Sequence, residues 1–142
     1  MSALHEILLV DDNPADNFIH KSVIERLHAA GKITVAEDGA QALEYLQDIA
    51  ASPERRMPEL IFLDINMPRM NGWEFLDQLE AMEDAMQGTI VVMMLTTSLH
   101  PDDQAAADQR KELAGFLNKP LTKAALGELL EEKFPGRFSR AD

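Results

Sequence analysis

Cysteine is absent from this chain of 142 residues. The protein therefore has no disulfide bond and no thiol nucleophile, which agrees with a reducing compartment. Long apolar runs are also lacking, because no stretch approaches the roughly 18 to 20 consecutive apolar residues of a membrane span. The first ten residues have neither the basic start nor the small-residue cleavage site of a signal peptide. We therefore expect a soluble protein that stays in the cytoplasm and does not associate with a membrane.

Basic residues are scarce: 13 Lys and Arg stand against 25 Asp and Glu, for a formal net charge of -12. Binding to nucleic acid needs clusters of Lys and Arg against the phosphates, so this composition argues against a nucleic-acid partner. An acidic chain suits cations and protein partners better. With 46% hydrophobic and 27% charged residues, the composition is that of an ordinary globular domain.

Short apolar runs alternate with helical patterns along the chain. Each run, ended by polar residues, is typical of a buried strand. The runs predict strands at residues 7–10, 33–36, 60–63, 90–95 and 115–117.

Apolar residues at helical spacing predict a helix after each strand. We expect the first helix to begin at Pro14 and to end near Gly31, a residue suited to a C-cap. The fourth helix, starting near Pro101, has a weak apolar face of alanines, so we expect it to be the least firmly packed. The apolar stripes of the other four helices are Phe18, Ile19, Val23 and Leu27; Leu43, Leu46 and Ile49 after Gly39; Phe75, Leu76, Leu79 and Met82 after Trp73; and Leu126, Leu129 and Leu130.

Five alternations of strand and helix predict an α/β fold in which a parallel sheet has helices on both faces. We expect a doubly wound sheet with the strand order 2-1-3-4-5. Residues 1–142 would form a single domain with its core at about 4–134. The last residues, 135–142, would be a short tail, so we expect no output domain.

Three aspartates follow the first and third predicted strands: Asp11 and Asp12 after the first, and Asp64 after the third. These strands are neighbours in the predicted order, so the three carboxylates should converge on one pocket. Two carboxylates about 4 Å apart repel by about 4 kcal/mol at an effective dielectric near 20, so such a cluster needs a counter-charge. Mg²⁺ suits it, because it takes one or two carboxylates and leaves room for a phosphate oxygen.

Two further side chains point to phosphoryl transfer at this pocket. Lys119 follows the fifth predicted strand and supplies a fixed positive charge, while Thr96 follows the fourth and offers a hydroxyl. A metal, a lysine and a hydroxyl can surround the three equatorial oxygens of a phosphoryl group. Asp64 is the best nucleophile because it stands alone at its strand end, whereas Asp11 and Asp12 are better placed to hold the metal.

Together these motifs make the chain similar to a response-regulator receiver domain, over about residues 6–134. The resemblance implies a flavodoxin-like fold in a protein of two-component signalling. It rests on Val10-Asp11-Asp12, Leu63-Asp64 with Met67-Pro68 and Asn71-Gly72, Thr96, and Lys119-Pro120, in that order.

The resemblance implies that Asp64 accepts a phosphoryl group from a sensor histidine kinase or a histidine phosphotransfer protein. Mg²⁺ would be held by Asp11, Asp12 and Asp64, together with the backbone carbonyl of Asn66. Lys119 would pair with the phosphoryl group. Two switch residues are implied as well, Thr96 and Phe116.

The expected protein is a stand-alone receiver, a monomer or weak dimer, that catalyses only its own phosphorylation and dephosphorylation. It would signal through the surface of the fourth helix, fifth strand and fifth helix. Two outcomes stay open: binding of a downstream protein target, or relay of the phosphoryl group.

Several residues depart from the family pattern or allow a plainer interpretation. The run Thr96-Thr97-Ser98 leaves a one-residue choice for the switch hydroxyl, and we favour Thr96 because it directly follows the apolar strand. Phe116 lacks the hydroxyl of the commoner tyrosine and is equally compatible with a simple core aromatic. Leu121 replaces a frequent phenylalanine. The four histidines, His5, His20, His28 and His100, show no metal-ligand spacing and are predicted at the surface.

The alternative function is a Mg²⁺-dependent phosphatase that also forms an aspartyl phosphate. Such enzymes usually need a second acid two residues after the nucleophile, where this chain has Asn66. A flavin-binding module of the same fold would need a hydroxyl- and glycine-rich loop after the first strand, and Asp11-Asp12-Asn13 would repel its phosphate.

Overall fold

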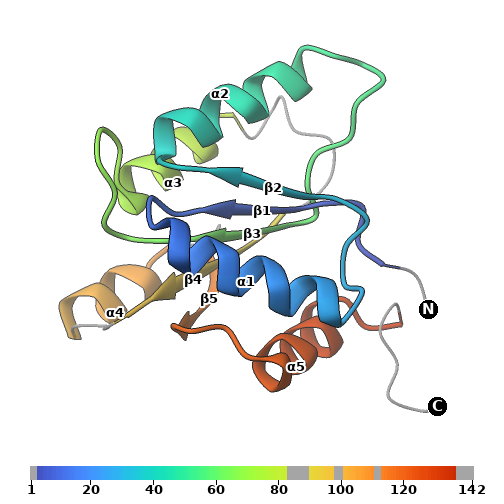
Figure 1. Cartoon of the computed structure of the whole chain (residues 1–142). Helices are drawn as coiled ribbons and strands as arrows, with labels where there is room; N and C mark the ends of the chain where they lie inside the picture. Colours follow the sequence, from blue (N-terminus) through green and yellow to red (C-terminus); the bar gives the residue numbers. More distant parts are fainter. Residues whose placement is uncertain (1–2, 83–89, 98–100, 111–112, 137–142) are drawn as a thin grey trace.

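The computed structural model describes residues 3–82, 90–97, 101–110 and 113–136. Five parallel strands form one sheet in the order β2-β1-β3-β4-β5, which confirms the predicted topology (Figure 1). The strands are β1 (Ile7–Val10), β2 (Ile33–Ala36), β3 (Leu60–Leu63), β4 (Val91–Thr96) and β5 (Leu113–Asn118). The first three have the predicted bounds, whereas β4 is shifted by one residue and β5 is longer at both ends.

The register of the central strands brings the chain segments after them to one edge. Val10, the last residue of β1, pairs with Ala36 of β2 and with Leu63 of β3. The residues that follow β1 and β3 therefore leave the sheet side by side, at the place where the strand order reverses. The long connection between α2 and β3 lies at the opposite edge, because it leads into the amino end of a strand.

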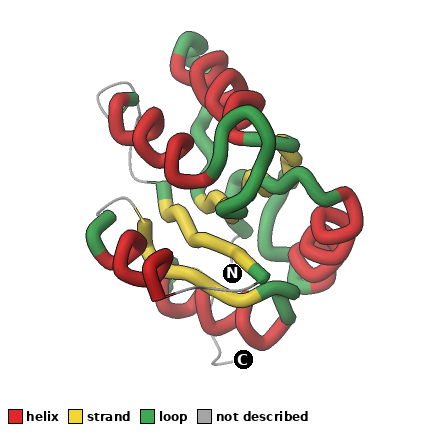
Figure 2. The backbone as a smooth tube through the Cα atoms, turned by 90° about the vertical axis from the view of Figure 1, so that its left-hand side faces the viewer, coloured by secondary structure: helices red, strands yellow, loops and turns green. Residues whose placement is uncertain are grey.

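Five helices cover the two faces of the sheet. They are α1 (Pro14–Arg26), α2 (Gly39–Ala50), α3 (Gly72–Ala81), α4 (Pro101–Asp108) and α5 (Lys123–Lys133). Figure 2 shows the helices around the sheet. The longest has 13 residues, and none of the described helices is both long and apolar enough to cross a membrane.

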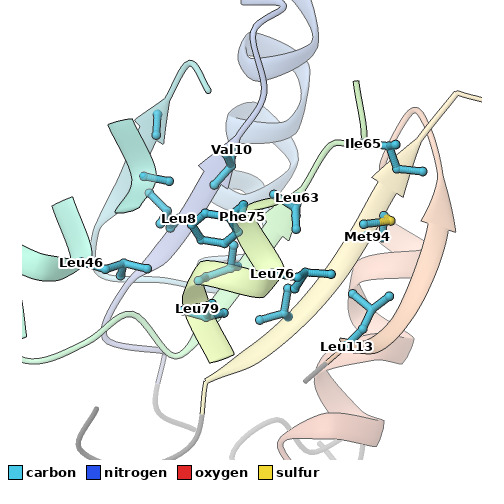
Figure 3. Close-up of a cluster of buried hydrophobic side chains, with 14 of the residues drawn as sticks. Leu8, Val10, Leu46, Leu63, Ile65, Phe75, Leu76, Leu79, Met94 and Leu113 are labelled. Atoms are coloured by element: carbon cyan, nitrogen blue, oxygen red, sulfur yellow. The ribbon is translucent and has the colours of Figure 1, made fainter. Parts of the chain in front are cut away.

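Two buried apolar clusters hold the helices to the sheet. On one face Leu8, Val10 and Met94 pack with side chains of α2 and α3, including Leu46 and Phe75 (Figure 3). On the other face, Leu9, Phe62 and their neighbours pack with Ile24 of α1 and with the predicted leucines of α5. Because β1 and β3 contribute to both clusters, their side chains are apolar on both faces.

Polar caps set the starts of four helices. Asn13 accepts hydrogen bonds from the backbone of Ala15 and Asp16, and Asp38 accepts one from Gln41. Asn71 forms a reciprocal capping box with Glu74, and Thr122 caps α5. A side-chain acceptor at this position satisfies backbone N–H groups that have no partner within the helix.

The buried face of α1 differs from the prediction. Phe18 and Ile19, expected in the apolar stripe, are 76% and 43% exposed. Asn17, His20 and Ile24 face the sheet instead, at the i, i+3, i+7 spacing of one helical face. The prediction was wrong for Phe18 and Ile19, because this helix buries two polar side chains in their place. Val23 and Leu27, the other predicted members of the stripe, are partly buried against the apolar cluster.

Two other expectations for α1 were also wrong. The helix ends at Arg26 with Leu27 as its C-cap, and His28 rather than Gly31 takes the left-handed backbone conformation after it, with φ 51°. Gly31 lies further on, where its N–H donates to the Leu4 carbonyl. His20 is buried, not at the surface. His28 is exposed and His5 half-buried, while His100 lies outside the described residues.

Candidate functional site

The three aspartates predicted to converge do so at the carboxyl edge of the sheet. Carboxylate oxygens of Asp11, Asp12 and Asp64 lie within 4.8 Å of one another. Asp11 is buried, Asp12 is exposed, and the Asp64 side chain retains 12% of its accessible surface. The cluster is thus open to solvent on the Asp12 side and enclosed on the Asp11 side.

Lys119 lies against this cluster, as predicted. Its Nζ is 2.6 Å from Asp11 Oδ2 and 3.7 Å from Asp64 Oδ2. The Lys119 backbone N–H donates to the Thr96 carbonyl at 2.7 Å, so the ends of β4 and β5 are joined next to the site. This bond fixes the start of the lysine side chain, and the Lys119–Pro120 peptide bond that follows is cis.

Asp16 is a further member of the site, and the sequence interpretation missed it. Its Oδ2 accepts a hydrogen bond from Lys119 Nζ at 2.9 Å. An acidic residue in the first turn of a helix has an ordinary explanation, which is interaction with the helix dipole. Only the folded structure shows that this carboxylate reaches a lysine 103 positions away.

The electrostatics of the site oppose the charge on Asp64. Burial, followed by the charge of Asp11, raises the pKa of Asp64 to about 6, although Lys119 and the Ile65 N–H act in the other direction. Burial alone would lower the pKa of Lys119. Its hydrogen bonds to Asp11 and Asp16 outweigh burial, so that this pKa lies above its usual value. The lysine is therefore a fixed cation, while Asp64 is destabilised as an anion.

The other predicted site residues surround this centre at different depths. Thr96 is buried as the last residue of β4, whereas Thr97 is exposed, and Ser98 lies outside the described residues. Asn66 is exposed, two residues after Asp64 in the β3–α3 loop. Phe116 is half-buried on β5 and packs against the apolar cluster that contains Met94.

A small polar layer lies beneath Asp11. Asn17 donates from Nδ2 to the Asp11 backbone carbonyl at 2.9 Å. Asn17 and His20 line the same small recess as Asp11 and Asp64. Burial and the charge of Lys119 lower the pKa of His20, against the opposing effects of Asp11 and Asp16. The surroundings of His20 therefore favour the neutral form of its imidazole.

Comparison with known proteins agrees with this site. The family model of the response regulator receiver domain matches residues 7–131, a range that includes every site residue named above. The chain belongs to the response-regulator receiver family.

Relatives and solved structures of this family resemble the receiver along most of its length. It is 35% identical over 126 residues to the probable methanogenesis regulatory protein FilR2 of Methanothrix harundinacea, covering 89% of this chain and 79% of that protein. It is 33% identical over 101 residues to response regulator Rcp1 of Synechocystis, covering 71% and 67%. A two-component response regulator from Cytophaga hutchinsonii superposes with a TM-score of 0.83 at 33% identity, covering 92% and 97%.

The donor set of this receiver fits a hard divalent cation. Receiver domains generally bind Mg²⁺ at an acidic pocket, and here three carboxylates meet with Lys119 as a cation on one side. Asp11, Asp12 and Asp64 supply oxygen atoms, which are the ligands that Mg²⁺ prefers. The exposed Asp12 leaves an approach from solvent.

Proposed function

We propose that this receiver accepts a phosphoryl group on Asp64, from the phosphohistidine of a sensor histidine kinase or of a histidine phosphotransfer protein. The observation that carries the proposal is the position of Lys119, whose Nζ lies 3.7 Å from Asp64 Oδ2 beside the carboxylate cluster. Receivers interact with histidine kinases or phosphotransfer proteins, which supports this class of partner. Asp64 is more exposed than Asp11, with 12% against 6% of its side-chain surface accessible. An incoming phosphoryl group can therefore reach it.

In the transfer, an Asp64 oxygen forms a bond to phosphorus as the P–N bond of the phosphohistidine breaks. The electron pair of that bond stays on the imidazole nitrogen, which later takes a proton from water. Lys119 neutralises charge on the phosphoryl oxygens, and the Asp64 carboxylate needs no separate base because it attacks as an anion. Mg²⁺ held by Asp11, Asp12, Asp64 and the Asn66 carbonyl would supply further positive charge at these oxygens.

The position of Thr96 beside Lys119 suggests how phosphorylation of Asp64 would change the conformation of the receiver. Thr96 would offer its hydroxyl to the phosphoryl group, and its carbonyl already accepts from Lys119 at 2.7 Å. Thr96 also pairs with Asn118 in the sheet, two residues after Phe116. Movement of Thr96 would therefore shift β5. Phe116 would then change its packing against the apolar cluster. The changed surface would be that of α4, β5 and α5, where a downstream protein binds.

The exposed apolar residues of α1 supply a docking surface for the partner that carries the phosphohistidine. Phe18 and Ile19 are exposed in the helix that begins directly after Asp11 and Asp12. The same helix places Asp16 on Lys119. A partner that buries Phe18 would therefore contact the helix that begins at the edge of the sheet where Asp64 lies, and transfer requires it at that edge.

The test of phosphorylation is incubation with acetyl phosphate or phosphoramidate and Mg²⁺, followed by intact-mass measurement. We expect one phosphate adduct on the wild type and none on Asp64→Asn. Asp48→Asn, an exposed aspartate of α2, is the matched control and should be phosphorylated normally. An unmodified wild type, or an equal adduct on Asp64→Asn, would overturn the assignment, and turnover of a phosphorylated metabolite would favour the phosphatase.

The test of docking compares two phosphate donors. Phe18→Ser should slow transfer from a phosphorylated histidine phosphotransfer protein, while leaving the rate with acetyl phosphate unchanged. Val35→Ser is the control, because Val35 is also exposed but lies on the edge strand β2. Equal transfer rates for Phe18→Ser and Val35→Ser would show that docking occurs elsewhere.

A further inference from the structure

We propose that Arg69 and Asp38 form a clamp that positions the metal-binding loop between β3 and α3, and so sets the affinity for Mg²⁺. The inference deepens the proposed function, because it concerns the loop whose Asn66 carbonyl is the proposed metal ligand. The clamp residues lie outside the carboxylate cluster. They act on the site through the backbone and are positioning residues.

The ion pair joins two segments that meet only in the folded chain. Arg69 donates from Nε at 2.8 Å and from Nη2 at 2.5 Å to the same oxygen of Asp38. Asp38 is the N-cap of α2 and is buried, whereas 64% of the Arg69 side chain is exposed. Burial acts to raise the pKa of Asp38, but its hydrogen bonds from Gln41 and Arg69 outweigh burial and lower it. Asp38 is therefore a charged anchor.

Arg69 occupies a backbone conformation that side chains other than glycine rarely adopt. Its φ is 64°, in the left-handed region. Such a conformation persists where surrounding contacts hold it in place. It can end a helix, as at His28, and it is also enriched at functional sites. Two kinds of contact hold Arg69: its side chain donates both hydrogen bonds to Asp38, and the Met70 N–H donates to the Pro68 carbonyl at 2.7 Å across it.

A second contact locks the same part of the loop. The Gly39 N–H donates to the Met70 carbonyl at 3.2 Å. A Cβ atom on Gly39 would lie 2.8 Å from Met70 Cγ and 2.9 Å from that carbonyl oxygen, so only glycine permits this approach. Residues 38 and 39 at the start of α2 thus hold residues 69 and 70 of the loop.

The loop is closed at its base as well. Gly72 donates its N–H to the Ile65 carbonyl at 2.8 Å, and a Cβ on Gly72 would lie 2.5 Å from the Asp64 carbonyl oxygen. Asn66 therefore lies between Ile65, which is held by Gly72, and residues 69 and 70, which are held by the start of α2. Because the side chain of Asn66 is exposed, these backbone contacts are what define where its carbonyl points.

The experiment measures Mg²⁺ affinity through the fluorescence of Trp73, the one tryptophan of the chain, next to Gly72. Arg69→Ala removes the clamp, and we expect its Kd for Mg²⁺ to rise about tenfold, the size typical for residues that support metal ligands. Asp38→Asn, which retains a capping side chain, should show a similar rise with unchanged helix content by circular dichroism. Arg56→Ala is the control, since it changes the net charge equally at an exposed position away from the loop.

Arg69→Gly separates the clamp from backbone strain, because glycine adopts the left-handed conformation at no cost. If the clamp sets the loop position, Arg69→Gly weakens Mg²⁺ binding as Arg69→Ala does. Wild-type affinity in Arg69→Gly together with weakened binding in Arg69→Ala would overturn the clamp, since strain alone would then explain the loss.

Amide hydrogen exchange in EDTA gives a measurement without metal. The amides of residues 65–71 should exchange faster in Arg69→Ala than in the wild type or Arg56→Ala. Unchanged exchange would overturn the clamp even if Mg²⁺ binds the wild type normally. A wild type that shows no Mg²⁺ binding would instead overturn the proposed function, so the two failures are distinguishable.

Discussion

As the proposed nucleophile, Asp64 combines two demands that conflict, because a nucleophile must be charged while burial disfavours its charge. Burial and Asp11 raise its pKa to about 6. A carboxyl group whose pKa is higher in the folded state contributes to stability below its unfolded pKa, near 4, and loses that contribution as the pH rises through 6. At neutral pH without metal, the site thus opposes folding.

Asp64→Asn should therefore stabilise the metal-free protein. We expect its free energy of unfolding to exceed that of the wild type by about 1–3 kcal/mol at pH 7.5 and by about half as much at pH 5. Urea unfolding in EDTA at both pH values, followed by Trp73 fluorescence, measures the difference. Equal stability at pH 7.5, or a difference independent of pH, would contradict the raised pKa.

If Lys119 pairs with a phosphoryl group on Asp64 as we propose, Asp16 competes with that group for the lysine. The lysine Nζ is closer to Asp16, at 2.9 Å, than to Asp64, at 3.7 Å. Asp16→Asn weakens this hold and should speed phosphorylation by acetyl phosphate about three- to tenfold, which corresponds to about 1 kcal/mol for one charge-assisted hydrogen bond. Glu25→Gln makes the same change in net charge at an exposed site on α1 and is the control. A slower Asp16→Asn would instead mean that Asp16 holds the lysine in its productive position.

The residues that sequence interpretation placed correctly are those at strand ends. Asp11, Asp64 and Lys119 each follow an apolar run, so topology alone brings them together. Asp16 and His20 were missed because they lie within a helix, where the sequence does not show which face is buried. On α1 the signal was also misleading, since exposed Phe18 imitates a core residue. Such conflicts between local pattern and packing are typical of functional surfaces.

Among the helices in the described part of the chain, α4 has the fewest buried residues. Only Ala107 of its eight residues is buried, whereas α5 buries three leucines. Because each Å² of buried apolar surface contributes about 25 cal/mol, packing against the sheet stabilises α5 substantially more than α4. The weak alanine face was visible in the sequence.

We therefore expect α4 amides to exchange with deuterium faster than α5 amides in the unphosphorylated protein. Hydrogen exchange measured by mass spectrometry checks this order, with α2, which is firmly packed through Leu46 and Ile49, as the internal reference. Phosphorylation should slow exchange in α4 if this helix belongs to the responding surface. Equal protection of α4 and α5 before phosphorylation would contradict the expectation.

At the scale of the whole molecule, the net charge of -12 adds general repulsion to the local repulsion of the site. Mg²⁺ should relieve the local part by binding only the folded state. At a concentration about 100 times its Kd it would add about 2.7 kcal/mol to the free energy of unfolding. Thermal unfolding with Mg²⁺, against NaCl of equal ionic strength, separates site binding from general screening. The difference between the two salts should vanish in Asp11→Asn; a persistent difference would place the cation elsewhere.

The sheet order and both helix layers were predicted from the chain because each element carries its own periodic pattern. Helix ends were less predictable. The end of α1 is followed by His28 in a left-handed backbone conformation. A histidine in the sequence does not predict that conformation. The clamp between Asp38 and Arg69 was equally hidden, since it joins residues from separate elements by contacts that exist only after folding.

The connection between α2 and β3 has a practical value for building sensors. Residues 53–56 in it are exposed, and they lie at the edge of the sheet opposite to Asp64. Exposed loop tips are the places where inserted domains are best tolerated. A fluorescent reporter inserted there would leave free both the proposed phosphorylation site at Asp64 and the proposed partner surface of α4, β5 and α5, so one fusion protein could report phosphorylation and partner binding in a living cell.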